Sequence, residues 1–83
     1  MIAKQKIPFT LREGEEHIQL IQLLKAAGCV ENGAQAQAAV SDGMVKRNGE
    51  TELRKRAKLV SGDVIEFQDW IIEVKKPSNG WSQ

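Results

Sequence analysis

The chain has 83 residues, of which 41% are hydrophobic and 28% are charged, and its formal net charge is +1. This length supports one domain with a single small core, and the composition is typical of globular proteins. Its one cysteine, Cys29, excludes an intrachain disulfide and a cysteine-based metal site. No apolar run is long enough for a signal peptide or for the roughly 18 residues of a membrane span. We therefore expect a cytoplasmic protein without membrane contact.

The N-terminal third predicts one strand and one helix. Apolar side chains alternate over residues 7–11, which predicts a short strand. Pro8 places that strand at the edge of a sheet, because proline cannot donate a ladder hydrogen bond. Leucine, isoleucine and alanine then recur with a helical period, which predicts a helix over residues 15–27. Gly28 is suited to end this helix because it tolerates positive φ.

A second, shorter helix is predicted to begin after Asn32. Gln35 follows Asn32 by three residues, as in a capping box. The alanine-rich sequence from residue 34 to 40 has high helix propensity, and its small side chains allow close packing against the first helix. Gly43 is expected to end this helix.

The remaining elements are predicted to be two β-hairpins. Asn48-Gly49 is the dipeptide best suited to a two-residue type I′ turn. Residues 54–59 have no clean period and are interpreted as an extended loop. Phe67 and Trp70 belong to the second hairpin, and we expect both to pack in the core. The predicted strands are 44–47, 50–53, 64–67 and 70–74.

This order of elements predicts an α+β fold. Two packed helices should cover one face of a small, mostly antiparallel sheet. We expect a single domain over residues 1–76, with residues 77–83 forming a disordered tail.

Positive charge is concentrated in residues 44–58, which have a net charge of +4 and leave the rest of the chain at −3. Only Glu50 and Glu52 oppose the cations in this segment. Such asymmetry is typical of a phosphate-binding surface on an otherwise neutral scaffold. The alternative is a basic hairpin that is merely solvated. The cations are Lys46, Arg47, Arg54, Lys55, Arg56 and Lys58.

Several short features occur in a specific order along the chain. They are Leu24–Gly28, Asn32-Gly33, Ala36, Val40, Gly43, Val45–Gly49 and Gly62-Asp63. In this order they resemble the RNA-binding domain first named for ribosomal protein S-four, also called the alpha-L motif. The resemblance spans residues 15–68 and is greatest to small stand-alone bacterial members with a Gly-Ala-Gln-Ala pattern and an Arg-Lys-Arg run. It implies the alpha-L fold and binding to structured RNA through the two helices and the loop after the first hairpin.

The chain departs from that family's pattern in its helices. Gly33 and Gln37 stand where the family usually has basic residues, and Gln19 and Ile21 replace an Arg and an Asp. The part of the RNA surface carried by the helices is therefore electrically weaker. As a compensation, Gly33 leaves the first backbone amides of the second helix unshielded, and helix N-termini bind phosphate through such amides. Glu31 opposes this effect by placing a carboxylate nearby.

Nine residues are predicted to bind RNA. Neighbours on a strand face opposite sides, so we expect only one of Lys46 and Arg47 to reach RNA. The glutamines can hydrogen-bond 2′-hydroxyls or phosphates, although exposed helix residues of this type are more often without function. The set is Arg54, Lys55, Arg56, Lys58, Lys46, Arg47, Gly33, Gln35 and Gln37.

Catalysis is not expected. The sequence has no paired carboxylates at a recognisable spacing, no nucleophile with a base and no glycine-rich phosphate loop. His17, the one histidine, has no second histidine or cysteine pair with which to bind a metal. We therefore predict a monomeric, ribosome-associated RNA-binding protein without cofactor or metal. The alternative is an adaptor that recruits an acidic protein partner to ribosome-associated or RNA-modifying complexes.

Overall fold

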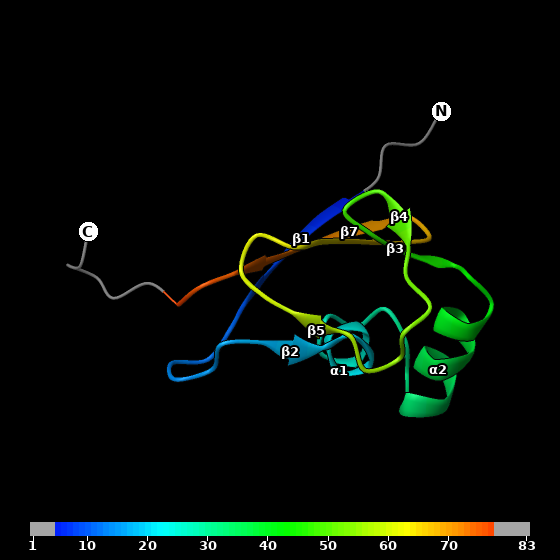
Figure 1. Cartoon of the computed structure of the whole chain (residues 1–83), viewed down its shortest axis with the longest axis horizontal. Helices are drawn as coiled ribbons and strands as arrows, with labels where there is room; N and C mark the ends of the chain where they lie inside the picture. The colour runs from blue at the N-terminus through cyan, green and yellow to red at the C-terminus, as the bar shows by residue number, and fades with distance from the viewer. Residues whose placement is uncertain (1–4, 78–83) are drawn as a thin grey trace.

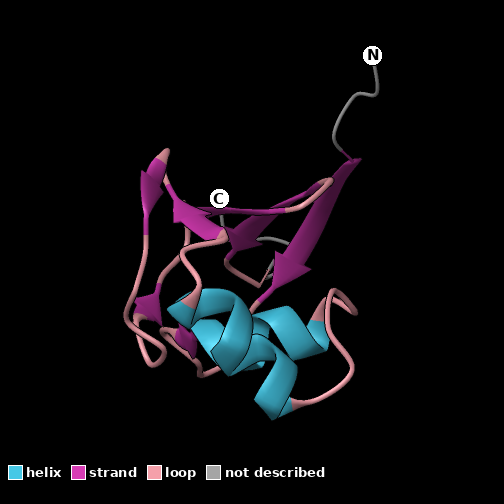
Figure 2. Ribbon diagram, turned by 90° about the vertical axis from the view of Figure 1, so that its right-hand side faces the viewer, coloured by secondary structure: helices cyan, strands magenta, loops and turns pink. Residues whose placement is uncertain are grey.

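The computed structural model describes residues 5–77 and shows a mixed sheet with two helices on one face (Figure 1). In spatial order, the sheet contains β1 (Gln5–Thr10), β7 (Trp70–Lys75), β6 (Val64–Phe67), β3 (Val45–Arg47) and β4 (Glu50–Thr51). The second layer contains α1 (Leu20–Ala26), α2 (Gly33–Ser41) and a ribbon of β2 (Ile18–Gln19) and β5 (Lys58–Leu59). Figure 2 shows this second layer beneath the sheet. The predicted α+β fold, with two packed helices against a mostly antiparallel sheet, is confirmed.

β1 is an edge strand, as predicted, and it runs parallel to β7. The other pairs in this sheet are antiparallel. The Gln5 amide donates to Asp69 O (2.8 Å) and the Leu11 amide to Lys75 O (2.8 Å), so the odd-numbered amides face β7. Pro8 therefore turns its nitrogen, which has no proton, to the free edge. This placement removes a donor from the edge and disfavours pairing with a further strand.

Helix α1 begins later than predicted, at Leu20 instead of residue 15. Ile18 fits the helical apolar period, but it lies in β2 opposite Leu59. The Leu20 amide donates to Ala57 O (2.9 Å), which fixes the chain before the helix. The predicted loop over residues 54–59 is accordingly wrong at its end, because residues 58–59 form β5. Local periodicity could not reveal this pairing between segments about 40 residues apart.

Helix α2 begins as predicted. Asn32 Oδ1 accepts from the Gln35 amide (2.9 Å), and Gln35 Oε1 accepts from the Glu31 amide (2.7 Å). The second bond ends one residue before the usual capping-box position. The helix then packs against α1 through its small side chains, as expected. The buried residues of the pair are Leu20, Leu23, Leu24, Ala36, Ala39 and Val40.

Both predicted hairpins are present. Asn48 and Gly49 have φ values of 53° and 90°, consistent with the predicted type I′ turn, although β3 and β4 are shorter than the predicted strands. Phe67 is buried and Trp70 is half-buried against the core, with their rings stacked at 6.2 Å between centroids. Core packing of this aromatic pair is confirmed. Of the tail predicted over residues 77–83, all but Pro77 lies outside the described residues.

Candidate nucleic-acid interface

Residues 53–57, which lie in the connection from β4 to β5, are called the basic loop below. Its three cations, Arg54, Lys55 and Arg56, are all exposed. Its backbone is joined to the start of α1, because Lys55 O accepts from the Ile21 amide (3.3 Å) and Ala57 O accepts from the Leu20 amide. The loop therefore has a defined path while its charged ends face solvent.

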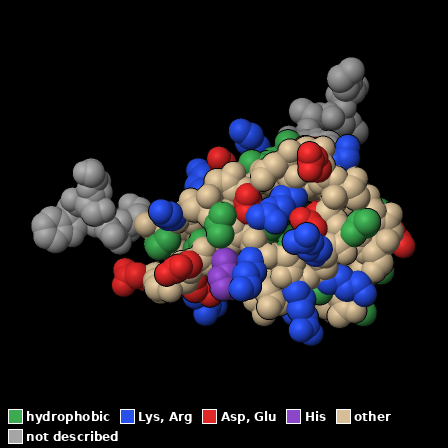
Figure 3. Space-filling view, in the orientation of Figure 1, with side chains coloured by type: hydrophobic (Ala, Val, Ile, Leu, Met, Phe, Trp, Pro, Cys, Tyr) green, Lys and Arg blue, Asp and Glu red, His purple; other side chains and the backbone are tan. Residues whose placement is uncertain are grey.

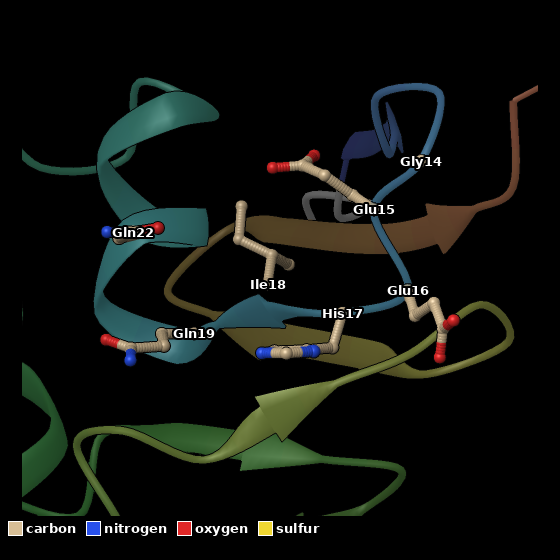
Figure 4. Close-up of a pocket in the computed structure, with 7 residues that line it drawn as sticks. All are labelled: Gly14, Glu15, Glu16, His17, Ile18, Gln19 and Gln22. Atoms are coloured by element: carbon tan, nitrogen blue, oxygen red, sulfur yellow. The ribbon is translucent and has the colours of Figure 1, made fainter.

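The β2–β5 ribbon extends this basic surface. Gln19 lies opposite Lys58 in the register, while the neighbouring pair, Ile18 and Leu59, faces inward. In Figure 4, His17 and Gln19 point to the side of β2 opposite Ile18. The structure thus places Gln19 and His17 on the outer ribbon face with Lys58. Sequence reasoning missed this group because it placed both residues in a helix.

Figure 3 shows how charged side chains are distributed over one face of the molecule. Lys and Arg side chains gather over the β2–β5 ribbon and the segment leading into it, with some acidic side chains among them, and a further group of acidic side chains lies at the left, where the chain passes from β1 to β2. A shallow hollow of about 440 Å³ lies at the acidic end, lined by Gly14–Gln19 and Gln22 (Figure 4). A polyanion would be attracted to the cations beside the ribbon and repelled by Glu15 and Glu16, which line the other end of this hollow.

Lys46 and Arg47 lie on opposite faces of the sheet. Val45 is fully buried beneath the sheet, so strand alternation places Arg47 on the same side and Lys46 on the outer side, opposite Glu66. Lys46 is therefore not brought beside the basic loop. Arg47 does face the loop, but its guanidinium already contacts other residues of the chain.

Arg47, Asn48 and the buried Asp63 form a hydrogen-bonded polar group, called the Asp63 network below. Arg47 Nη2 (2.9 Å) and the Val60 amide (2.8 Å) donate to Asp63 Oδ2, and Asn48 Nδ2 donates to Oδ1 (3.1 Å). Asn48 Oδ1 in turn accepts from the Val64 amide (2.9 Å). These bonds join the Asn-Gly turn to the Gly-Asp turn.

The Asp63 network stabilises the charged carboxylate. Burial alone raises the pKa of Asp63, but the hydrogen bonds from Val60, Asn48 and Arg47, together with the charge of Arg47, outweigh it. The pKa therefore lies below its ordinary value. A carboxylate with this many donors stabilises the fold.

The predicted residues of α2 do not share one surface. Gln35 and Gln37 are both exposed, and the side chain of Gln35 contributes to the helix cap. Residues two apart on an α-helix are about 200° apart, so these glutamines cannot both face the same RNA surface. Gly33 is the first helical residue, and within residues 5–77 neither its amide nor that of Ala34 donates a hydrogen bond.

Residues 5–77 contain no group of three metal-binding side chains, and none of their helices is long and apolar enough to cross a membrane. Burial raises the pKa of the half-buried Cys29 thiol, which disfavours the reactive thiolate.

A sequence profile of the S4 domain matches residues 9–75. The chain belongs to the S4 domain family. It is 43% identical over 58 residues to the "Putative RNA-binding protein YbcJ" of Escherichia coli K12, covering 70% of this chain and 83% of that protein. The same values hold for the "Uncharacterized protein YbcJ" of Shigella flexneri.

The S4-domain fold is also found in a solved relative. The solution structure of YbcJ from E. coli, described as revealing an alphaL motif involved in RNA binding, has a TM-score of 0.65 to this protein. It is 38% identical in sequence, and the match covers 90% of this chain and 96% of that one. The predicted family and fold are therefore confirmed, whereas the individual RNA-binding residues stay predictions.

Proposed function

We propose that this S4-domain protein is a non-catalytic RNA-binding protein that recognises structured RNA, with ribosomal and transfer RNA as the expected classes. One observation carries the proposal. Four exposed cations, in the basic loop and at the start of β5, form no ion pair or side-chain hydrogen bond within residues 5–77. They are Arg54, Lys55, Arg56 and Lys58. The names of the YbcJ relatives support the same function.

Binding would depend mainly on phosphate neutralisation. Lys and Arg side chains that contact phosphates release condensed counterions, which provides affinity independent of sequence. The deep, narrow major groove of A-form RNA excludes side chains, so recognition would rest on shape and on 2′-hydroxyls. The amide of Gln19, beside Lys58, is placed to bond such hydroxyls, and Gln37 offers a second amide on α2.

The start of α2 is the second proposed contact. The free amides of Gly33 and Ala34 can donate to a phosphate oxygen, favoured by the positive end of the helix dipole. Glu31 weakens this site because its carboxylate is exposed nearby. We therefore assign the larger share of affinity to the basic loop and the smaller share to α2.

The test is salt-dependent binding to a fluorescent RNA stem-loop, followed by anisotropy, with a DNA hairpin of the same sequence as a comparison. If about four cations contact phosphate, log Kd should rise with log salt concentration with a slope of roughly 3–4. An Arg54→Ala/Lys55→Ala/Arg56→Ala variant should lower this slope by about 2–3, since each phosphate contact contributes about one. A flat salt dependence would contradict the proposal.

Crosslinking in cells, followed by sequencing of the bound RNA, would identify the RNA class. The triple-alanine variant is the matched control because it keeps the backbone contacts of the loop with α1. Recovery of ribosomal or transfer RNA by the unaltered protein alone would support the proposal. A protein partner that remains bound after nuclease treatment, without enriched RNA, would favour the adaptor function.

A further inference from the structure

The Arg47 guanidinium contacts three segments of the chain that meet at the base of the basic loop. Nη1 lies 3.6 Å from Glu52 Oε1, just before the loop. Nη2 donates to Lys58 O (3.1 Å), just after the loop, and to Asp63 Oδ2. This set of contacts from Arg47 to Glu52, Lys58 and Asp63 is called the Arg47 bridge below.

Glu52 also fixes the first residue of the loop that carries a charge. Its Oε2 accepts from the Arg54 amide (3.1 Å), while its own amide donates to Val45 O (2.9 Å) in the hairpin. One carboxylate therefore connects the Arg47 bridge to the backbone of the basic loop. Because arginine has five donors in a rigid plane, one side chain can hold both ends of the loop at a fixed separation.

The Arg47 bridge is partly shielded from water. The side chains of Arg47, Glu52 and Asp63 are 29%, 15% and 11% exposed. Partly buried pairs are screened by salt much less than exposed ones. The bridge should therefore persist at the salt concentrations at which RNA binding is measured.

We infer that Arg47 is a positioning residue, whose bridge to Glu52 and the Lys58 carbonyl holds the basic loop in the conformation that binds RNA. The inference rests on the proposed function. A loop that is ordered before binding loses less conformational freedom when it meets RNA. It follows that Glu52 supports RNA binding although its charge repels phosphate. Removing Glu52 should raise RNA affinity if only its charge matters, and lower RNA affinity if it positions the loop.

Glu52→Ala and Glu50→Ala form a matched pair for this test. Both remove one carboxylate from the same hairpin, but within residues 5–77 the Glu50 side chain forms no ion pair or hydrogen bond. We expect Glu50→Ala to bind the RNA stem-loop as tightly as the unaltered protein or up to about threefold more tightly, since a repelling charge is gone. Glu52→Ala should bind about three- to tenfold more weakly, because the loop must be ordered on binding. Equal tightening by both variants would overturn the inference.

Arg47→Lys provides a second variant that keeps the charge. A lysine cannot reproduce the planar fork of donors, so affinity should fall while the salt slope stays within about 0.5 of its original value. A slope lowered by about one would instead identify Arg47 as a direct phosphate contact and overturn the positioning role.

Hydrogen exchange in the free protein separates failure of this inference from failure of the proposed function. The bridge predicts faster exchange at residues 54–57 in Glu52→Ala and Arg47→Lys, with little change in the distant α2. Unchanged exchange in the basic loop of both variants would overturn the bridge, whatever the RNA result. Faster exchange, together with no stem-loop binding by the unaltered protein, would support loop ordering but overturn both the proposed function and the bridge's part in RNA binding.

Discussion

The Asp63 network and the basic loop are joined to the same β3–β4 hairpin, yet the charged side chains are paired in the network and unpaired, within residues 5–77, in the loop. In the network, Arg47 and Asp63 form a hydrogen-bonded ion pair beneath the sheet. In the loop, the Lys55 and Ala57 carbonyls accept from amides at the start of α1, while the side chains of the three cations have no partner within residues 5–77. The first region therefore stabilises the fold, and the second is available to a ligand.

This comparison explains why family resemblance identifies the fold more directly than the binding site. The Asn-Gly and Gly-Asp pieces that make the sequence recognisable meet in the Asp63 network. Their residue types are required by hydrogen bonds within the chain. Within residues 5–77 the cations of the basic loop meet no such internal requirement, so their number and placement can differ between proteins of one fold.

The largest expected effect is on stability, from Asp63→Ala. Removing the carboxylate takes the acceptor from the Asn48 side-chain amide and the Val60 amide, and it leaves Arg47 with only Glu52 and the Lys58 carbonyl as partners. We expect the free energy of unfolding to fall by about 2–4 kcal/mol, because a buried carboxylate with several donors is lost from the network. Urea unfolding measures this change. The control is Arg56→Ala in the basic loop, which should change stability by less than about 0.5 kcal/mol. A loss below about 1 kcal/mol from Asp63→Ala would show that the network is not the stabilising region.

A smaller effect is expected in acid. The folded-state pKa of Asp63 is lowered, so its carboxylate stabilises the fold above the unfolded-state pKa of about 3.9 and loses this contribution as the pH falls toward the folded-state value. Asp63→Asn lacks the titrating group. The unfolding free energy of the unaltered protein should therefore exceed that of Asp63→Asn at neutral pH, and the gap should narrow below about pH 4. Urea unfolding at a series of pH values tests this, and a gap that does not change with pH would contradict it.

Much of the fold could be predicted because its signals are local. The turn at Asn48-Gly49, the cap at Asn32 and the edge position of Pro8 each follow from one or two residues. The start of α1 could not be predicted, because Ile18 fits both a helical face and the inward side of a ribbon. Ile18 lies in a strand and not in the helix because it pairs with Leu59, about 40 residues further along the chain.

In the candidate site, too, the local features could be predicted from the sequence and the long-range contacts could not. The clustering of cations in the basic loop is visible as sequence composition. The contacts of Arg47 are not, since Asp63 lies 16 residues further along the chain and only the folded hairpins bring the two together. Alternation correctly separated Lys46 from Arg47, but it did not indicate which of them faces the interior.

The smallest expected effect is on RNA affinity, from substitutions at Gly33. Here one added charge should favour the fold and at the same time weaken RNA binding. A Cβ added at Gly33 meets no atom within 4 Å, so Gly33→Ala and Gly33→Glu should both fold. Glutamate at the first helical position should leave stability unchanged or raise it by a few tenths of a kcal/mol, because it interacts favourably with the helix dipole. The same charge should weaken binding of the RNA stem-loop by about two- to fivefold, since it competes with phosphate for the free amides. Gly33→Ala controls for the added side chain and should bind as the unaltered protein does. Equal affinities for the two variants would exclude the start of α2 from the interface and leave the basic loop and the β2–β5 ribbon as its only parts.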